Sequence, residues 1–255
     1  MSKVLKLDRR WLPLLGPLLL FALWQLLISA QFVKPVLLPP PGATLAHMAS
    51  VFASGAIFGD LWATIFRTLC SFGIATVIGV PLGVMLGSSE AAYRSVEFLI
   101  DFFRSTPSSA LIPLFLLIFG ITDINKIAIA SFGAMLIVLF NSAYGVMNAK
   151  KTRVMAAQIM GVSKWHVFKD VMLMESLAQT FVGLRSAVSM ALVIVIVAEM
   201  FIGSDNGLGH RIIDAQQVLN VKSMYAAILA AGALGYALNI LFLFAERRIV
   251  HWSGR

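Results

Sequence analysis

Six long apolar runs constrain this chain more than any other feature of its sequence. A helix needs about 20 mostly apolar residues to cross roughly 30 Å of hydrocarbon. The predicted spans are 11–32, 62–87, 96–120, 126–147, 177–203 and 224–245. Charged residues make up only 13% of the 255 residues, whereas ordinary soluble domains have about 25%. The sequence therefore predicts an all-α polytopic membrane protein with about six transmembrane helices.

The distribution of Lys and Arg predicts the orientation of these spans. With the N-terminus in the cytoplasm, most of the twenty Lys and Arg residues fall on the cytoplasmic side. The basic residues assigned to the outside are Lys34, Arg67, Lys126, Arg211 and Lys222. This asymmetry follows the positive-inside rule, so the net charge of +8 does not indicate nucleic-acid binding. The predicted organisation is a cytoplasmic segment at 1–10, a single transmembrane domain at 11–250 and a cytoplasmic tail at 251–255.

A polar stretch at 148–176 separates the fourth and fifth spans. Apolar residues recur at spacings of three and four on both sides of Gly161, which is typical of two short amphipathic helices. Because the charge pattern places this stretch in the cytoplasm, it is a candidate surface for a partner protein. The alternative is a loop that lies on the membrane surface, with lysine side chains that reach the headgroups.

Two spans carry irregular features. Gly79, Gly83 and Gly87 recur at a spacing of four in the second span, and small residues on one face let helix backbones approach closely. We therefore predict a helix-packing face there. The third span is interrupted at 105–109 and again at Pro113, because proline removes a helical hydrogen bond. Broken helices often line the substrate route of transporters, and the alternative is a simple kink or a cytoplasmic turn.

Polar residues within spans are candidate functional residues, because they are costly in lipid. Glu199 is the clearest case, and it lies too far along its helix from Arg185 for the two to pair. Its partner must come from another span, from water or from a second subunit. The candidate residues of a translocation path or gate are Ser105, Pro107, Ser109, Pro113, Asn141, Tyr144 and Glu199. The alternative is a purely structural role as hydrogen-bonding residues between helices.

The sequence contains no recognisable catalytic or nucleotide-binding motif. The patterns GxxxxGK[ST], HExxH and GxSxG are absent, and the four histidines are scattered along the chain. The single cysteine, Cys70, excludes a disulfide within the chain. We therefore expect no enzyme activity, no cofactor and no metal site in this chain.

Several motifs together resemble the permease subunits of bacterial ABC importers, in particular the nitrate, sulfonate, taurine and bicarbonate group. Ala156, Ala157 and Gly161 follow the family's EAA loop, which docks on the ATPase. Other stretches resemble the family's LPxP, GxPLGxxxG, PxxAxxPL, FGxGxxxK and EMxxxxxGLG patterns. These stretches are 38–42, 79–87, 107–114, 119–126 and 199–209.

The resemblance implies a dimer of six-span permeases in the bacterial cytoplasmic (inner) membrane. Its partners would be a dimer of ABC ATPases, which hold ATP and Mg²⁺ and contact residues 150–173, and a periplasmic or lipid-anchored binding protein. The coupling residues implied in this way are Ala156, Ala157, Met160, Gly161, Lys164, Trp165, Phe168 and Lys169. The substrate would be a small solute such as nitrate, a sulfonate or taurine. The alternative function is a channel or ion-gradient-driven transporter with Glu199 as its ion site.

The loop departs from the family pattern at two places. Met155 stands where Glu is common, and Met174 and Glu175 stand where Leu-Pro is expected. Without that proline, the helix after Leu173 is free to continue into the fifth span. We expect the coupling segment, defined as residues 151–172, to contact the ATPase through flexible methionine side chains.

Overall fold

The computed structural model describes residues 12–149 and 151–250, and every regular element in these ranges is a helix. This agrees with the predicted all-α class. The predicted cytoplasmic segments at 1–10 and 251–255 lie outside the described residues.

The chain divides into two compact units. Unit 1 comprises Met1–Phe58 and Arg211–Ala230, and unit 2 comprises Gly59–His210 and Ala231–Arg255. Because helices α10 (Leu208–Gln217) and α11 (Val221–Ile249) each contribute residues to both units, the two units are described one at a time.

Four described helices are long and apolar enough to cross a membrane, or five if one sharply bent pair counts as a span. The four are α3 (Phe58–Gly87), α6 (Asp123–Met147), the continuous stretch Lys164–Phe201, and α11. Helix α1 (Leu12–Ser29) is a shorter apolar helix. The first predicted span is therefore shorter than expected, because Gln31 has a positive φ of 56° and the helix ends before it.

Unit 1 contains α1, helix α2 (Pro41–Ala53) and parts of α10 and α11. Pro41 stands in the first turn of α2, where proline is tolerated because its missing N–H has no helical partner. Trp24 of α1 lies with its ring 5.8 Å from that of Tyr225. His47 and Ser223 form a 2.9 Å hydrogen bond. These contacts link segments that are distant in sequence.

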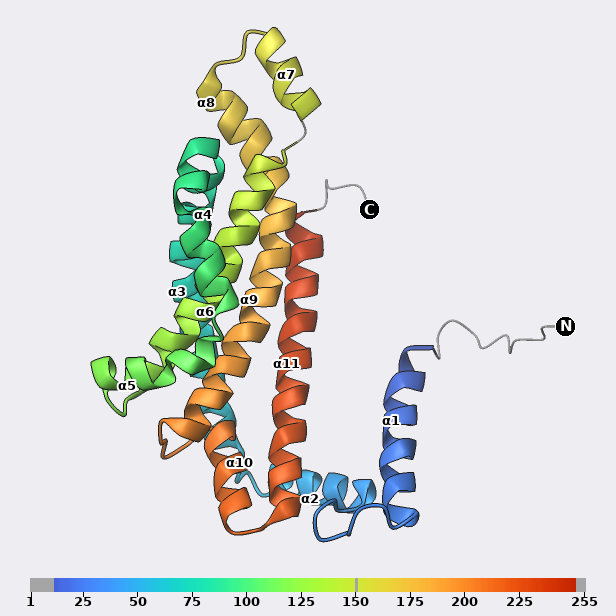
Figure 1. Cartoon of the computed structure of the whole chain (residues 1–255). Coiled ribbons are helices and arrows are strands. Elements are labelled where there is room, and N and C mark those ends of the chain that lie inside the picture. Colours follow the sequence, from blue (N-terminus) through green and yellow to red (C-terminus); the bar gives the residue numbers. More distant parts are fainter. Residues whose placement is uncertain (1–11, 150, 251–255) are drawn as a thin grey trace, which may run out of the picture. The chain divides into compact units, whose positions relative to one another are not determined.

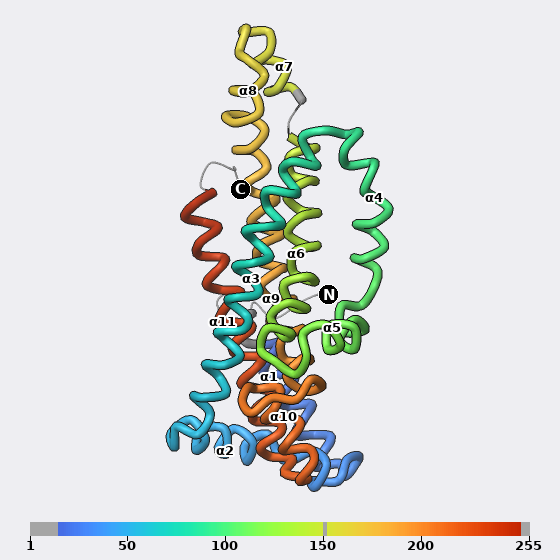
Figure 2. Tube along the Cα trace, turned by 90° about the vertical axis from the view of Figure 1, so that its left-hand side faces the viewer, coloured from blue at the N-terminus to red at the C-terminus, as the bar shows by residue number. Residues whose placement is uncertain are grey.

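The centre of unit 2 is the antiparallel pair of α6 and α9 (Leu173–Phe201), which run side by side in Figures 1 and 2. Ala134 and Val138 of α6 pack with Ala187 and Ala191 of α9, and none of these four side chains is accessible to solvent. Small residues at a helix contact let the two backbones approach closely. This pair forms the core on which the other helices of unit 2 pack.

The glycine row of α3 faces α6. A Cβ atom at Gly79 would lie 3.0 Å from the Met135 carbonyl oxygen, and one at Gly83 would lie 2.4 Å from the Leu139 carbonyl oxygen. At Gly87 it would lie 2.5 Å from the Ala143 carbonyl oxygen. Because real Cβ atoms essentially never come within 3.0 Å of such an atom, Gly83 and Gly87 require glycine at the present helix separation, while Gly79 lies at that limit.

We expect Gly83→Val to destabilise unit 2 by about 1–3 kcal/mol or more, because the added side chain must separate α3 from α6. Gly73→Val is the matched control on the same helix, since a Cβ atom there meets no atom within 4 Å. Equilibrium unfolding of the purified protein in a detergent titration measures the difference. Equal losses for the two variants would mean that the glycine row does not set the α3–α6 distance.

The third predicted span is broken where the sequence indicated. Helix α4 (Glu90–Ser105) is followed by a 3-10 turn, η1 (Ser108–Leu111), and by α5 (Ile112–Phe119). The two halves are bent by 88°. Neither half is long enough to span a bilayer by itself at 1.5 Å per residue.

The helix that contains the fifth predicted span, 177–203, begins well before residue 177. Helix α7 (Lys151–Ile159) is short and separate, as expected for the first half of the polar stretch. The second half of the polar stretch is not a separate helix. From α8 (Lys164–His166) the chain passes through a π-helical segment, η2 (Val167–Met172), directly into α9. The absence of proline after Leu173 explains this continuity.

Candidate functional site

The coupling segment turns at Gly161. The Val162 amide donates to the Ala157 carbonyl at 3.1 Å, and the Gly161 amide donates to the Gln158 carbonyl at 3.0 Å. This pair of bonds is a Schellman motif, which requires a left-handed residue after the helix. Gly161 has a φ of +77°, so it provides that conformation. Ser163 then caps the next helix by accepting a hydrogen bond from the His166 amide.

Large apolar side chains are exposed around this turn. Ile159 is 86% exposed, Met160 80% and Trp165 65%. Exposed apolar side chains that lie close together mark interaction surfaces. Of the predicted coupling residues, Ala157 and Phe168 are half-buried and the rest are exposed: Ala156, Met160, Gly161, Lys164, Trp165 and Lys169. The structure therefore brings the predicted coupling residues together on one accessible end of unit 2.

A groove of about 440 Å³ lies between α7 and the start of the long helix, lined by Val154 and Gln158 on one side and by Trp165 and Phe168 on the other. The Trp165 and Phe168 rings are 5.9 Å apart. An ion pair between Arg153 and Glu175, with 2.5 Å between Nη1 and Oε1, links α7 to α9. The segment is thus attached to the long helix at its base while its tip stays accessible.

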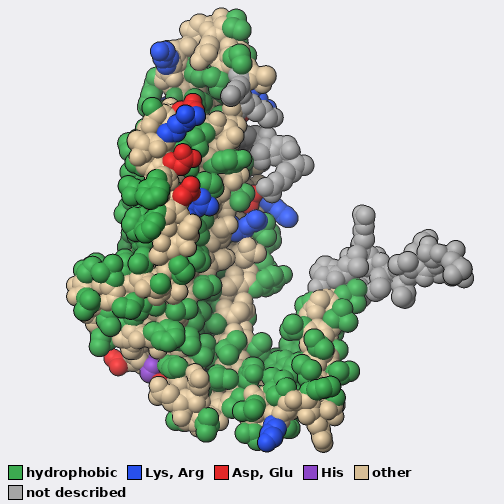
Figure 3. All heavy atoms as spheres, in the orientation of Figure 1, with side chains coloured by type: hydrophobic (Ala, Val, Ile, Leu, Met, Phe, Trp, Pro, Cys, Tyr) green, Lys and Arg blue, Asp and Glu red, His purple; other side chains and the backbone are tan. Residues whose placement is uncertain are grey.

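Figure 3 shows where the charged side chains of unit 2 gather, with the nearby apolar surface in green. Blue and red side chains lie over α4 and toward α8, at the end that carries the coupling segment. The α4 charges include the exposed pairs Arg94–Glu90 at 2.7 Å and Arg104–Asp101 at 3.3 Å. This end of unit 2 combines charge with exposed apolar side chains, as a protein-docking surface does.

A second candidate site lies at the other end of α9, where Glu199 is buried. Its carboxylate accepts a 2.7 Å bond from Arg67 Nη1 and bonds of 2.9–3.0 Å from the Thr64 hydroxyl. The Gly209 amide donates to Oε2 at 2.9 Å. Glu199 is 1% exposed and Arg67 3% exposed. Of the three sources that the sequence left open, another span provides the partner, which is Arg67 of α3.

Arg67 also holds the loop that follows α9. Its guanidinium donates to the carbonyl oxygen of Asn206 at 3.0 Å and to the Asn206 side chain at 2.6 Å. Its Nε donates to Asp123 at the start of α6 at 2.9 Å. Lys126 donates to Asp123 and to Ser204, both at 3.2 Å. This ion-pair cluster joins α3, α6 and α9 at one point. It is buried at Arg67, Lys126 and Glu199 and open to solvent at Asp123.

Two glycines allow the loop to approach Glu199. A Cβ atom at Gly207 would overlap the Glu199 carboxylate, and Gly207 has a φ of +124°. A Cβ atom at Gly209 would overlap the Ile196 carbonyl oxygen. Leu208, between them, donates its amide to the Thr64 hydroxyl at 2.9 Å. The Glu199 to Gly209 pattern therefore encodes a loop folded around a buried carboxylate.

The other predicted path residues lie apart from this cluster. Asn141 accepts a 2.9 Å hydrogen bond from Gln179, which links α6 to α9, while Tyr144 is exposed beside Phe140. Ser105, Pro107, Ser109 and Pro113 lie at the break between α4 and α5. Among the described residues, the hydrogen bonds and ion pairs named above for the Glu199 cluster include none of these other predicted path residues.

Arg67, Asp123 and Lys126 were not predicted from the sequence as members of the cluster around Glu199. Arg67 and Lys126 were assigned to the outer side of the membrane from charge counting. Two signals were available in the sequence. Arg67 lies inside an apolar run, and Asp123 and Lys126 form an acid–base pair three residues apart at a helix start. Ion pairs between side chains of different helices cannot be predicted from one sequence, because they depend on which helices become neighbours.

Together, the fold and these sites define a polytopic helical membrane protein with an exposed, partly apolar turn at one end of unit 2. The family model described as "Binding-protein-dependent transport system inner membrane component" matches residues 79–251. The chain belongs to this family.

Relatives with known names agree with this assignment. The chain is 27% identical to the putative aliphatic sulfonates transport permease protein SsuC of Bacillus subtilis, over 94% of this chain and 86% of the relative. It is 25% identical to the taurine transport system permease protein TauC of Escherichia coli, over 92% and 87%. It is 26% identical to the nitrate import permease protein NrtB of Leptolyngbya laminosa, over 91% and 84%.

The fold is similar to that of a chain in an inward-facing structure of the MetNI methionine ABC transporter. The TM-score is 0.63 at 23% identity, and the match covers 77% of this chain and 95% of the other. The protein is therefore the membrane-spanning permease component of an ABC importer. It is not an enzyme, since ATP hydrolysis belongs to a separate ATPase subunit. The alternative of an ion-gradient-driven transporter with Glu199 as its ion site is not favoured.

Proposed function

We propose that two copies of this chain form the pathway of a bacterial importer for a small anion such as nitrate, a sulfonate or taurine. In this proposal residues 11–250 act as one transmembrane domain in the cytoplasmic membrane. A separate binding protein delivers the anion from outside. ATP and Mg²⁺ are held by two ATPase subunits, and this chain holds no cofactor or metal. The names of the sulfonate, taurine and nitrate relatives support the anion class.

The observation that carries the proposal is the exposed coupling segment, 151–172. Its Gly161 turn presents Ile159, Met160 and Trp165 to solvent at one end of unit 2. The proposed contact is the insertion of these apolar side chains into a groove of the ATPase. Because the chain continues without a break from Lys164 to Phe201, a displacement at this contact would be transmitted along the whole helix. This gives the ATPase a mechanical connection to the pathway.

Uptake into proteoliposomes tests the proposal. The permease is reconstituted with its ATPase and binding protein, and the uptake of taurine, ethanesulfonate and nitrate is measured with internal ATP or with a proton gradient. We expect ATP to drive the uptake of at least one of these anions and the proton gradient to have no effect. Uptake that follows the proton gradient without ATP, or no uptake of any of the three, would contradict the proposed function.

A further inference from the structure

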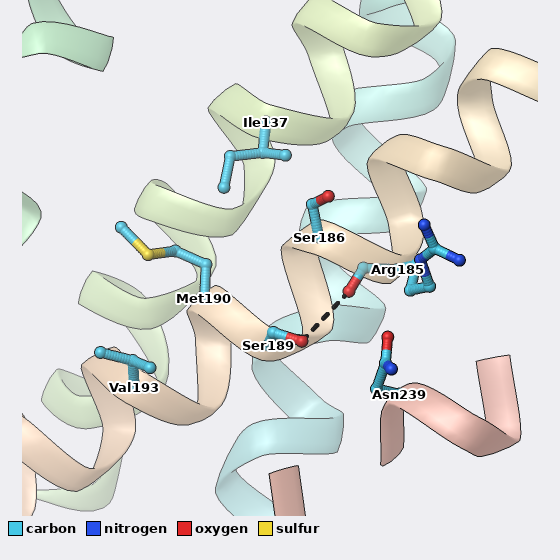
Figure 4. A pocket seen from close by; sticks show the side chains of 7 residues that line it. All are labelled: Ile137, Arg185, Ser186, Ser189, Met190, Val193 and Asn239. Atoms are coloured by element: carbon cyan, nitrogen blue, oxygen red, sulfur yellow. Dashed lines mark hydrogen bonds between the residues drawn. The ribbon is translucent and has the colours of Figure 1, made fainter. Parts of the chain in front are cut away.

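A groove of about 420 Å³ on α9 has no role in the sites described so far. Arg185, Ser186, Ser189, Met190 and Val193 of α9 line it, together with Ile137 of α6 and Asn239 of α11. Figure 4 shows these side chains from the three helices around one open space. Its volume is within the usual range of small-molecule sites, about 300–1,000 Å³.

Arg185 gives this groove a charged side chain beside apolar surface. It lies opposite Glu246, three residues before α11 ends at Ile249. A charged side chain on a largely apolar helix faces protein or water, because lipid does not solvate it. The Arg185 side chain is 31% exposed. The groove is therefore a place where water or a polar ligand meets the bundle.

Arg185 and Asn239 are available as hydrogen-bond donors. The nearest carboxylate, Glu246 of α11, lies 3.6 Å from Arg185 Nη1, which exceeds the length of a charge-assisted hydrogen bond. Among the residues that the structure describes, none accepts a hydrogen bond from the Arg185 guanidinium or from the Asn239 amide. Figure 4 shows the Asn239 side chain pointing toward Arg185. Two neighbouring polar groups thus have donors to offer a ligand.

Ser186 and Ser189 add two hydroxyl groups that can form hydrogen bonds with a ligand. At present their hydroxyls donate within the helix, Ser186 to the Val182 carbonyl at 3.0 Å and Ser189 to the Arg185 carbonyl at 3.3 Å. A serine hydroxyl rotates and also accepts hydrogen bonds, so each can adjust to a ligand. Met190, Val193 and Ile137 supply the apolar wall. The combination suits a ligand with an oxyanion at one end and a short apolar group at the other.

We propose that this groove is an anion-binding site on the transport route, in which Arg185 and Asn239 hold a small oxyanion such as a sulfonate or nitrate. The planar guanidinium presents its N–H donors in a fork that matches oxyanion geometry. Glu246 offsets part of that charge without lining the groove. The site therefore binds weakly, as a site that must also release its ligand requires. The identity of the anion rests on the proposed function, whereas the preference of the groove for negative charge does not.

The charge preference is tested by cysteine modification. Ser186→Cys is made in a Cys70→Ser background and studied with the ATPase in inside-out membrane vesicles. It is treated with an anionic sulfonatoethyl thiosulfonate or with a cationic trimethylammonium thiosulfonate of similar size. The rate of each reagent with the protein is divided by its rate with a free thiol. We expect this corrected rate to be roughly tenfold higher for the anionic than for the cationic reagent. We expect Arg185→Gln to abolish this preference. No reaction, or a preference that persists without Arg185, would overturn the proposal.

Ala187→Cys is the matched control, since Ala187 is adjacent on the same helix and fully buried. It should remain unmodified. Equal modification at both positions would mean that the reagents detect opening of the helix bundle, and the groove would then not be the site.

Uptake separates this inference from the proposed function. If the wild-type importer transports none of taurine, ethanesulfonate and nitrate, the proposed anion import is wrong, whereas the labelling result still decides the groove. If it transports one of them, we expect Arg185→Gln to lower uptake roughly tenfold, with partial rescue by Arg185→Lys. Glu246→Gln should retain most of the uptake. Equal losses in Arg185→Gln and Glu246→Gln would identify a structural link between α9 and α11 and overturn the proposal.

Discussion

Arg67→Met is expected to destabilise the folded permease by about 3–5 kcal/mol, because it leaves the Glu199 carboxylate buried without its countercharge. Glu199 is 1% exposed, and Arg67 Nη1 lies 2.7 Å from its Oε1. The Thr64 hydroxyl and the Gly209 amide remain as donors. These neutral groups do not replace the charge of the guanidinium. Equilibrium unfolding in a detergent titration measures the loss.

A double variant identifies the cause. Glu199→Gln removes the buried charge, so adding it to Arg67→Met should recover at least about 1 kcal/mol of the loss. Arg94→Ala is the control for loss of an exposed ion pair, since the side chains of Arg94 and Glu90 are 71% and 76% exposed. It should change stability by less than about 1 kcal/mol. Additive losses in the double variant would show that Arg67 and Glu199 are not energetically coupled.

Gly161→Val is expected to lower ATP-driven uptake roughly tenfold while the permease still inserts and folds. Gly161 has a φ of +77°, and a β-branched residue is strained there by about 1–3 kcal/mol. About 1.4 kcal/mol corresponds to a tenfold change in the population of the native turn. Because a Cβ atom at this position meets no atom within 4 Å, the effect comes from backbone conformation and not from a clash. Uptake per folded transporter, measured in proteoliposomes, reports this change.

Gly161→Asn is the matched variant. Asparagine adopts the left-handed conformation more readily than other non-glycine residues, so it should retain most of the uptake. Normal uptake by Gly161→Val, or equal losses in both variants, would mean that the turn conformation does not control coupling.

Local features of the fold could be predicted from the sequence, because they depend on neighbouring residues. Glycines four residues apart identified the face of α3 that packs on α6. Pro107 indicated the break that separates α4 from α5. Gly161 indicated the turn after α7, because only a small set of residues closes a helix in this way.

Features that depend on the tertiary fold could not be predicted. The missing proline after Leu173 left the helix free to continue into the fifth span, but the sequence did not show that this helix begins as early as Lys164. The Arg67–Glu199 pair joins residues from α3 and α9 that charge counting treated independently. The groove around Arg185 likewise requires α6, α9 and α11 to converge. The ion pair and the groove both depend on which helices become neighbours, and a single sequence does not contain that information in readable form.

We propose that a separate ATPase engages this permease at the coupling segment. Copurification of the ATPase with a tagged permease tests this contact, using Trp165→Asp and the control Trp62→Asp. Both tryptophans are exposed, at 65% and 68%, but Trp62 lies near the start of α3, away from the segment. We predict that Trp165→Asp loses the ATPase while remaining folded, and that Trp62→Asp retains it wherever it is folded. Full retention of the ATPase by folded Trp165→Asp, together with undiminished ATP-driven uptake, would contradict the account.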